Sequence, residues 1–224
     1  MNFLELCKRV RQEAGISGTG PSSVLNQGGE MRRVVDWVIS AWTEIQLTRK
    51  NWMWMRGSFS FQTVANDHDY SASEADIAAR FRMWDRTTLR LYKTSEGVAN
   101  EFYIPFISYH DYLMVYMTGT QTPTRPVCFT VAPDMKLLLG PKPDGEYTVR
   151  GDYWKASQTL AADEDIPEMP EEYHLYIVAA ALEKYALYES ATEVLARARQ
   201  DKRFYKNQVE ATQLPPMEMA EPLC

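Results

Sequence analysis

The chain has 224 residues, of which 45% are hydrophobic and 24% charged, so it can bury the core of one ordinary domain or two small ones. Its formal net charge of -6 disfavours a protein that scans DNA through a global cationic field. Three cysteines without a CxxC spacing argue against a disulfide framework and a four-ligand zinc site, and they favour a reducing compartment. We expect neither a membrane span nor a signal peptide, because no apolar run approaches about 18 residues.

Two helices are predicted at the start of the chain. Apolar residues recur at helical spacing over 3–14, where Asn2 can cap the helix with Glu5 three positions on. A loop rich in Gly, Ser and Pro follows over 15–29. The second helix, over 30–50, carries a long apolar stripe and needs a partner helix, because its length is on the order of 30 Å. Its predicted core positions are Val34, Val38, Trp42 and Ile45.

The period of the pattern changes from 3.6 to 2 after the second helix. Phe59 and Phe61 alternate with polar residues, and 89–92 repeats this alternation, which is typical of half-buried strands. Another strand is predicted near 102–104, before a short helix that Ser108 caps.

The next segment, 126–154, is predicted to be an antiparallel meander. Its three strands are 127–131, 136–139 and 147–154, and its turns are 133–134 and 143–145. The middle hundred residues are therefore expected to be mostly antiparallel sheet.

Helix returns near the end of the chain. Pro170 suits a first turn, and Glu171 and Glu172 complement the positive end of the helix dipole. Val178 and Leu182 are predicted core positions on one face of this helix. Its other faces are also apolar, so we expect packing on more than one side, with a neighbouring subunit as one source of the second side.

A last helix and a tail complete the chain. Ser190 and Glu193 have the spacing of a capping box, which predicts a new helix start there. The stretch from Ala211 has three prolines and no periodicity, so we interpret 211–224 as an extended tail.

Together these elements predict an α+β fold. A discontinuous helical bundle over 1–55 and 165–210 carries an inserted antiparallel β-sandwich or barrel-like region over 56–164. That region includes one short helix, and the extended tail covers 211–224.

The histidines give little indication of an active site. Asp67, His68 and Asp69 lie in a polar turn, where consecutive side chains are expected to diverge, so a solvated turn is favoured over a metal or catalytic site. His110 and His174 are interpreted as partners of neighbouring carboxylates.

Other motifs are incomplete. The run 163–165 lacks the glycine and distal glutamate of a calcium loop and is interpreted as an acidic linker. The run 18–20 has neither the third glycine of a dinucleotide site nor the lysine of a phosphate loop. We therefore expect no catalytic residue, metal or cofactor, and we expect the tryptophans over 37–54 to be buried rather than to stack on nucleic acid.

The order of elements resembles that of head-to-tail adaptors of tailed bacteriophages, including the tail tubular protein A family. The resemblance spans nearly the whole chain and depends on the order of four segments together. They are MNFLELCKRVRQEAGISG, GGEMRRVVDWVISAWTEIQ followed by NWMWMRGSFSF, RPVCFTVAPDMKLLLGPKPDGEYTVRGDYWKA, and DIPEMPEEYHLYIVAAALEKYALYE.

The resemblance implies a structural protein at the head-tail junction of the virion, made in the host cytoplasm during assembly. It implies a homo-oligomer, a dodecameric ring under the portal protein, with tail or nozzle proteins as further partners. DNA would pass through its channel without sequence-specific binding, and no membrane is involved. Related connectors anchor a C-terminal segment in the portal. The corresponding portal-binding residues here are Leu214, Pro215, Pro216, Met217, Met219 and Leu223.

Two other functions remain open from the sequence. One is a β-sandwich recognition module of a phage tail, in which Tyr103, Tyr109 and Tyr116 stack on a sugar or receptor. The other is a hydrolase that uses two carboxylates, Asp85 and Asp152, which must then lie roughly 5 to 9 Å apart across a cleft.

Overall fold

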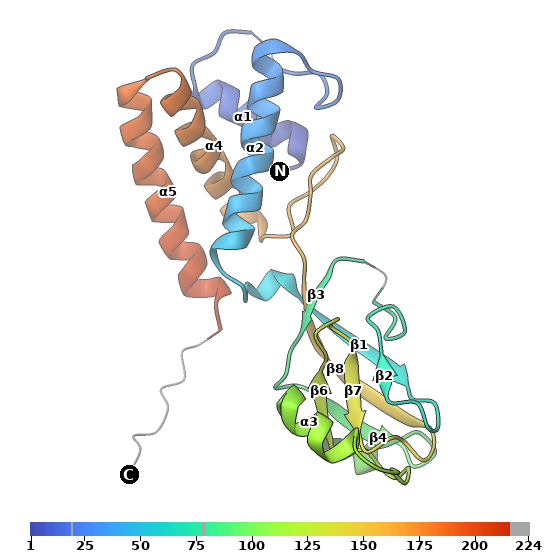
Figure 1. The fold of residues 1–224 in the computed structure, drawn as a ribbon. Coiled ribbons are helices and arrows are strands. Elements are labelled where there is room, and N and C mark those ends of the chain that lie inside the picture. The colour runs from blue at the N-terminus through green and yellow to red at the C-terminus, as the bar shows by residue number, and fades with distance from the viewer. Residues whose placement is uncertain (19, 78, 216–224) are drawn as a thin grey trace, which may run out of the picture. The chain divides into compact units, whose positions relative to one another are not determined.

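In a computed structural model, which describes residues 1–18, 20–77 and 79–215, the chain forms two compact units (Figure 1). The helical unit consists of Met1–Met55 and Ser157–Cys224, and the β-unit consists of Arg56–Ala156. Residues 157–164, which the sequence pattern placed with the β region, belong to the helical unit. Within the described residues, no helix is both long and apolar enough to cross a membrane.

Four α-helices make up most of the helical unit. They are α1 (Phe3–Glu13), α2 (Gly29–Thr48), α4 (His174–Tyr188) and α5 (Thr192–Gln213), with short 3-10 turns η1 (Met53–Met55) and η3 (Glu171–Tyr173). The predicted cap of α1 is confirmed, because the Asn2 side chain accepts a hydrogen bond from the Glu5 N–H and the Glu5 carboxylate accepts one from the Asn2 N–H, both at 2.9 Å. These two bonds satisfy N–H groups that have no partner inside the helix.

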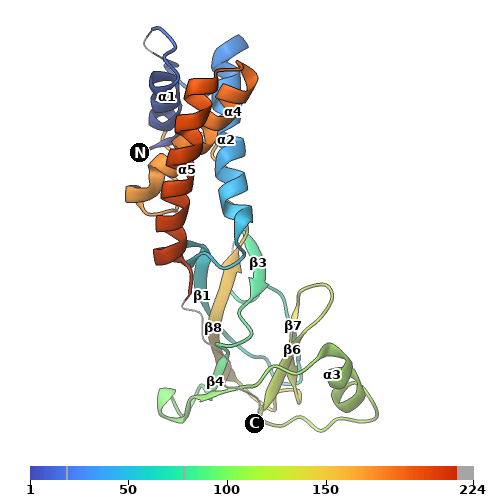
Figure 2. The same cartoon turned by 90° about the vertical axis from the view of Figure 1, so that its left-hand side faces the viewer.

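Helix α4 lies at the centre of this unit and packs against α1, α2 and α5, as Figure 2 shows for the neighbouring α4 and α5. Ile177 and Ala181 are completely buried in the cluster that these helices share. The prediction that α4 packs on more than one side is confirmed, and helices of the same chain supply these sides. Three helices of the same chain bury its apolar faces, because both ends of the chain contribute helices to one bundle.

The connection between α4 and α5 differs from the predicted capping box. Ser190 has φ 56°, in the left-handed region, and α5 starts after Ala191 without a side-chain cap. The Ala191 N–H donates to the Ala186 carbonyl at 2.9 Å, which closes the end of α4. The Ser190 backbone therefore forms the turn that reverses the chain between α4 and α5. Its side chain is not the N-cap of α5.

The β-unit contains two antiparallel sheets. Its strands are β1 (Arg56–Gln62), β2 (Asp69–Tyr70), β3 (Phe81–Trp84), β4 (Arg90–Lys93), β5 (Phe102–Tyr103), β6 (Cys128–Val131), β7 (Leu137–Gly140) and β8 (Tyr147–Lys155). The larger sheet has the order β1-β8-β4-β5, with β3 also paired to β8, and the smaller one has the order β2-β7-β6. A 3-10 turn, η2 (Val98–Asn100), precedes β5.

Strand β8 contradicts the predicted meander. The hairpin of β6 and β7 is present, but β8 pairs with β1, β3 and β4 and not with β7. The register places Val149 opposite Phe61 of β1 and opposite Leu91 of β4. These apolar side chains therefore lie on one face of the larger sheet and join the core of the unit. Burying them together favours this long-range pairing over the pairing of neighbours in the sequence.

The short helix of the β-unit is α3 (Tyr109–Tyr116). Its predicted cap is confirmed, because the Ser108 hydroxyl accepts from the Asp111 N–H at 3.1 Å. The buried Tyr112 hydroxyl donates to the Leu139 carbonyl at 3.0 Å and holds α3 on the smaller sheet. The sequence pattern missed β2, which has only two residues, and β3, whose sequence FRMW ends in two consecutive apolar residues that break the alternation.

Candidate functional site

The residues predicted as structural core all lie in the helical unit, and none is more than 3% exposed. They are Val34, Val38, Trp42, Ile45, Val178 and Leu182. Trp42 and Trp52 are each 1% exposed, and the Trp52 indole N–H donates to the Ile45 carbonyl at 3.0 Å. Trp54 stacks on Trp52 with a centroid distance of 4.5 Å. Since Trp42 and Trp52 are buried, they present no face for nucleic-acid stacking.

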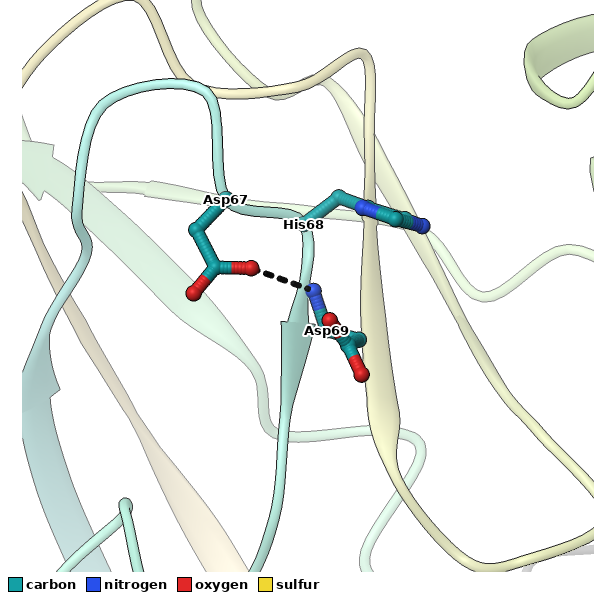
Figure 3. Close-up of side chains that lie close together, drawn as sticks. All are labelled: Asp67, His68 and Asp69. Carbon is teal, nitrogen blue, oxygen red and sulfur yellow. Dashed lines mark hydrogen bonds between the residues drawn. The ribbon is translucent and has the colours of Figure 1, made fainter.

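In the turn with Asp67, His68 and Asp69, the His68 ring points away from the Asp67 side chain, as the sequence predicts (Figure 3). Potential ligand atoms of the three residues all lie within 4.8 Å of one another (Figure 3). The turn is tight because an Asp67 carboxylate oxygen accepts from the Asp69 N–H at 3.4 Å.

One of these three groups already has a cationic partner. The Lys136 ammonium lies 2.5 Å from the Asp69 carboxylate, and this hydrogen bond holds the pKa of Asp69 below its usual value. This ion pair connects the turn that precedes β7 to strand β2. We therefore interpret this turn as a structural link, because the Asp69 carboxylate already pairs with Lys136.

The buried histidine has different partners from those predicted. His174 is 1% exposed, its Nδ1 lies 2.9 Å from the amino group of Met1, and its Nε2 lies 3.0 Å from the Met169 carbonyl. Because a carbonyl only accepts, Nε2 carries the proton and Nδ1 accepts from the amino group. The neighbouring Glu171 carboxylate instead pairs with Met1 at 2.9 Å. Burial lowers the pKa of His174 below its ordinary value.

Asp85 and Asp152 do come together, but on a shared cation. The same Nη2 atom of Arg56 lies 3.2 Å from an Asp85 oxygen and 2.7 Å from an Asp152 oxygen. Asp85 also accepts from the N–H and the hydroxyl of Thr87. The guanidinium occupies the space between the carboxylates, where a hydrolase places water or substrate. This geometry supports a structural ion-pair group.

The acidic run 163–165 does more than link two segments as predicted. Its carboxylates accept hydrogen bonds from backbone N–H groups. Asp163 accepts from the Val24 N–H at 2.6 Å, and Asp165 accepts from the N–H groups of Ala161 and Ala162. The last two bonds hold the pKa of Asp165 below its usual value. These carboxylates therefore order the loops around α1.

The start of the predicted portal-binding segment is part of the helical unit. Helix α5 continues to Gln213, so 211–213 are helical and not extended as predicted. Leu214 is half-buried against the core of the helical unit, and Pro215 is exposed. The remaining predicted residues, Pro216, Met217, Met219 and Leu223, lie outside the described residues.

The three aromatic residues proposed for ligand stacking differ in how far they are exposed to solvent. Tyr103 is 67% exposed, whereas Tyr109 is half-buried. Tyr116 packs over Gly140, where an added Cβ would lie 2.8 Å from its ring. The three rings therefore do not form one exposed platform.

An arginine pair in the β-unit was not singled out from the sequence. Arg90 and Arg150 are direct partners on β4 and β8, and Glu101 lies 3.6 and 3.8 Å from them. They line an open pocket of about 510 Å³ together with Ser58 and Asp76. Its detection required the pairing of β4 with β8, since the two arginines are far apart in the chain.

The comparison with known families gives the class of this protein, which is that of phage structural adaptors. The chain matches the family described as SU10 adaptor protein over residues 1–219 and belongs to that family. No curated protein sequence matches it. Membership implies a place at the virion head-tail junction, next to portal and tail proteins.

Proposed function

We propose that this protein is a head-to-tail adaptor that forms a dodecameric ring under the portal, joins the DNA-filled capsid to the tail and continues the DNA channel. The observation that carries the proposal is the family match over residues 1–219. Within the adaptors, the order of the four sequence segments favours the tail tubular protein A-like group. Nozzle or other tail proteins then contact the ring from the tail side.

The charge of the chain supports a channel that DNA crosses without being held. Each copy carries a formal charge of -6, so a ring multiplies a field that repels phosphate groups. The same repulsion opposes spontaneous closure of the ring. We therefore propose that the protein is a monomer or weak oligomer in the host cytoplasm, and that the portal acts as the template on which the ring closes.

The C-terminal segment is the proposed anchor in the portal. Leu214 belongs to the helical unit, so the anchor begins at Pro215 and uses Met217, Met219 and Leu223 as its apolar side chains. Prolines restrict the backbone before binding, and a restricted segment loses less conformational entropy when it docks.

Deletion of 216–224 tests this anchor with the full portal assembly. The shortened protein should melt at the same temperature as the full chain, because the deleted residues lie beyond α5. It should no longer co-purify with portal protein, and phage that carry it should yield DNA-filled heads that leak or lack tails. Normal yields of infectious particles would place the portal contact on the helices instead.

A second candidate function, sugar or receptor recognition by the β-unit, is favoured by the polar pocket at Arg90 and Arg150. Glycan binding that Arg150→Ala abolishes and Arg82→Ala leaves unchanged would support it. A chain that stays a lone monomer in the presence of portal protein would also favour this function over the adaptor.

A further inference from the structure

Strand β1 lies at one edge of the larger sheet, beside β8 (Figure 2). Its seven residues pair with β8 in a regular antiparallel register, without a bulge. The Thr63 N–H continues this ladder and donates to the Tyr147 carbonyl at 2.8 Å. Antiparallel strands exchange hydrogen bonds at every second residue, so residues 57, 59 and 61 bond to β8 as Thr63 does.

The alternate backbone groups of β1 therefore point away from the sheet. They are the N–H and C=O groups of Ser58, Ser60 and Gln62, and none of them has a hydrogen-bond partner within residues 1–18, 20–77 and 79–215. All three residues are exposed. A row of unpaired donors and acceptors is thus open to water along the whole strand.

The other strands at the edges of the two sheets are protected against pairing. Strands β2 and β5 have only two residues each. Strand β3 has a register shift between Phe81 and Met83. Strand β6 is covered, because Phe129 exchanges backbone hydrogen bonds with Pro105 and Ile107. Strand β1 has no proline, lysine or bulge, which are the usual devices that prevent an edge strand from pairing with another chain.

Open space lies beside the unpaired edge. The pocket of about 510 Å³ is lined by Ser58 and Ser60 of β1 and by Asp76 of the loop that follows β2. Asp76 is exposed and has no cationic partner in the described part of the chain. Arg150 and Arg90 lie one and two strands further into the sheet. The charge beside the edge strand itself is therefore the Asp76 carboxylate.

We propose that the edge of β1 binds an extended segment of a partner protein, which joins the larger sheet as a further strand and places a lysine or arginine beside Asp76. The outward groups of β1 recur at every second residue, about 6.8 Å apart, which is the repeat of an extended polypeptide. A backbone of this kind satisfies all of these donors and acceptors at once, and strand addition is an established mode of peptide recognition. A sugar has no such repeat.

A second copy of this chain suits the edge less well than a different protein. Antiparallel pairing of β1 with β1 around Ser60 would bring the Asp76 carboxylates of both copies to one seam, where they repel each other. The inference goes beyond the proposed function, because it concerns the β-unit and requires no portal. It is therefore tested on the full chain alone.

Amide hydrogen exchange of the full chain, followed by NMR, tests the strand site with a peptide probe. The probe is the capped peptide TVKVTVKVT, whose alternating pattern fits either strand direction. At about nine times its Kd, it should slow exchange of the Ser58, Ser60 and Gln62 amides about tenfold, because only the free fraction then exchanges. The amides of 57, 59 and 61 should change little, since they already bond to β8. This alternation distinguishes strand addition from a glycan in the same pocket.

A proline variant removes the edge without breaking the sheet. Ser60→Pro deletes one outward N–H and no bond to β8, and proline is tolerated on edge strands. It should weaken peptide binding at least tenfold. Ser60→Thr is the matched control, because it keeps the N–H, and it should bind as the wild type does. Equal peptide affinity of the two variants would overturn the proposal.

A change outside the strand keeps the test informative if Ser60→Pro does not fold. Asp76→Asn removes the charge and suits the positive φ of 58° at this position. It should weaken binding of the lysine probe about threefold. Glu193→Gln is the control for net charge, since Glu193 is exposed in the helical unit, and it should leave the affinity unchanged. Equal affinities of these two variants would overturn the pairing of a basic residue with Asp76.

Two further results would contradict the proposal. Exchange of the three outward amides that several millimolar peptide leaves unchanged would exclude strand addition. Their protection at high protein concentration without peptide would make a second copy the occupant. Each result is separable from the proposed function, because a protein that binds the peptide but no portal keeps the strand site and loses the adaptor role, and the reverse result keeps only the adaptor.

Discussion

The sequence specifies the two units of this protein differently, through local patterns in one and through contacts between distant residues in the other. In the helical unit, each helix has its own apolar stripe, and Trp42 and Ile177 meet in the shared core. In the β-unit, the central strand β8 finds its partners β1 and β4 dozens of residues away. Local patterns therefore specify the helices, whereas only the joint burial of distant residues specifies the sheet. Substitutions in each unit can test this difference.

The largest expected effect is in the helical unit. Trp42→Ala should lower the free energy of unfolding by roughly 3 to 5 kcal/mol, because it removes a large side chain that is 1% exposed. Denaturant unfolding followed by helical circular dichroism measures this change. Trp37→Ala is the matched control, since Trp37 is only partly buried, and its smaller cost should separate the two. Equal costs would mean that the core of α2 is misplaced.

A close approach in the β-unit gives the next largest effect. Gly140→Ala should cost about 1 to 3 kcal/mol, because its Cβ would lie 2.8 Å from the Tyr116 ring and 3.1 Å from the Tyr112 ring. Gly145→Ala is the control, since a Cβ there meets nothing within 4 Å. Thermal unfolding that finds the two variants equally stable would contradict the packing of α3 on β7.

The pH dependence should arise from the helical unit. The pKa of buried His174 lies below its ordinary value of 6.5, so between these two values the unfolded chain binds the proton more readily than the folded chain. Stability should therefore fall as the pH drops below about 6.5. Comparing unfolding at pH 7.5 and 5.5 for the wild type and His174→Gln measures this contribution, and an identical pH dependence in both would exclude it.

The smallest expected effect concerns the junction of α4 and α5. Ser190→Gly should stabilise the protein by up to about 1 kcal/mol, because glycine adopts a positive φ without the steric cost that serine has. If Ser190 were instead the N-cap of α5, the same change would cost a few tenths of a kcal/mol. The sign of the change in melting temperature therefore decides between the two roles.

These cases show what the sequence could and could not predict. Apolar spacing was sufficient to predict α2, and spacing together with a side-chain cap predicted α1 and α3, because the stabilising bonds of helices join residues three or four apart. The Ser190 pattern failed because a serine before a helix can serve either the cap or the turn. The pairing of β8, and with it the meeting of Arg90 with Arg150, depends on burial that no local window contains.

The candidate sites also depend on contacts between residues that are far apart in the sequence. The sequence placed Asp85 and Asp152 on separate segments, and only the pairing of β1 with β8 brings Arg56 between them.

Cryo-electron microscopy of purified virions is the most direct test of the central claim, that this chain is a structural adaptor between portal and tail. We predict a ring of this protein under the portal. Density for the protein elsewhere in the particle, or its absence from the head-tail junction, would contradict the claim.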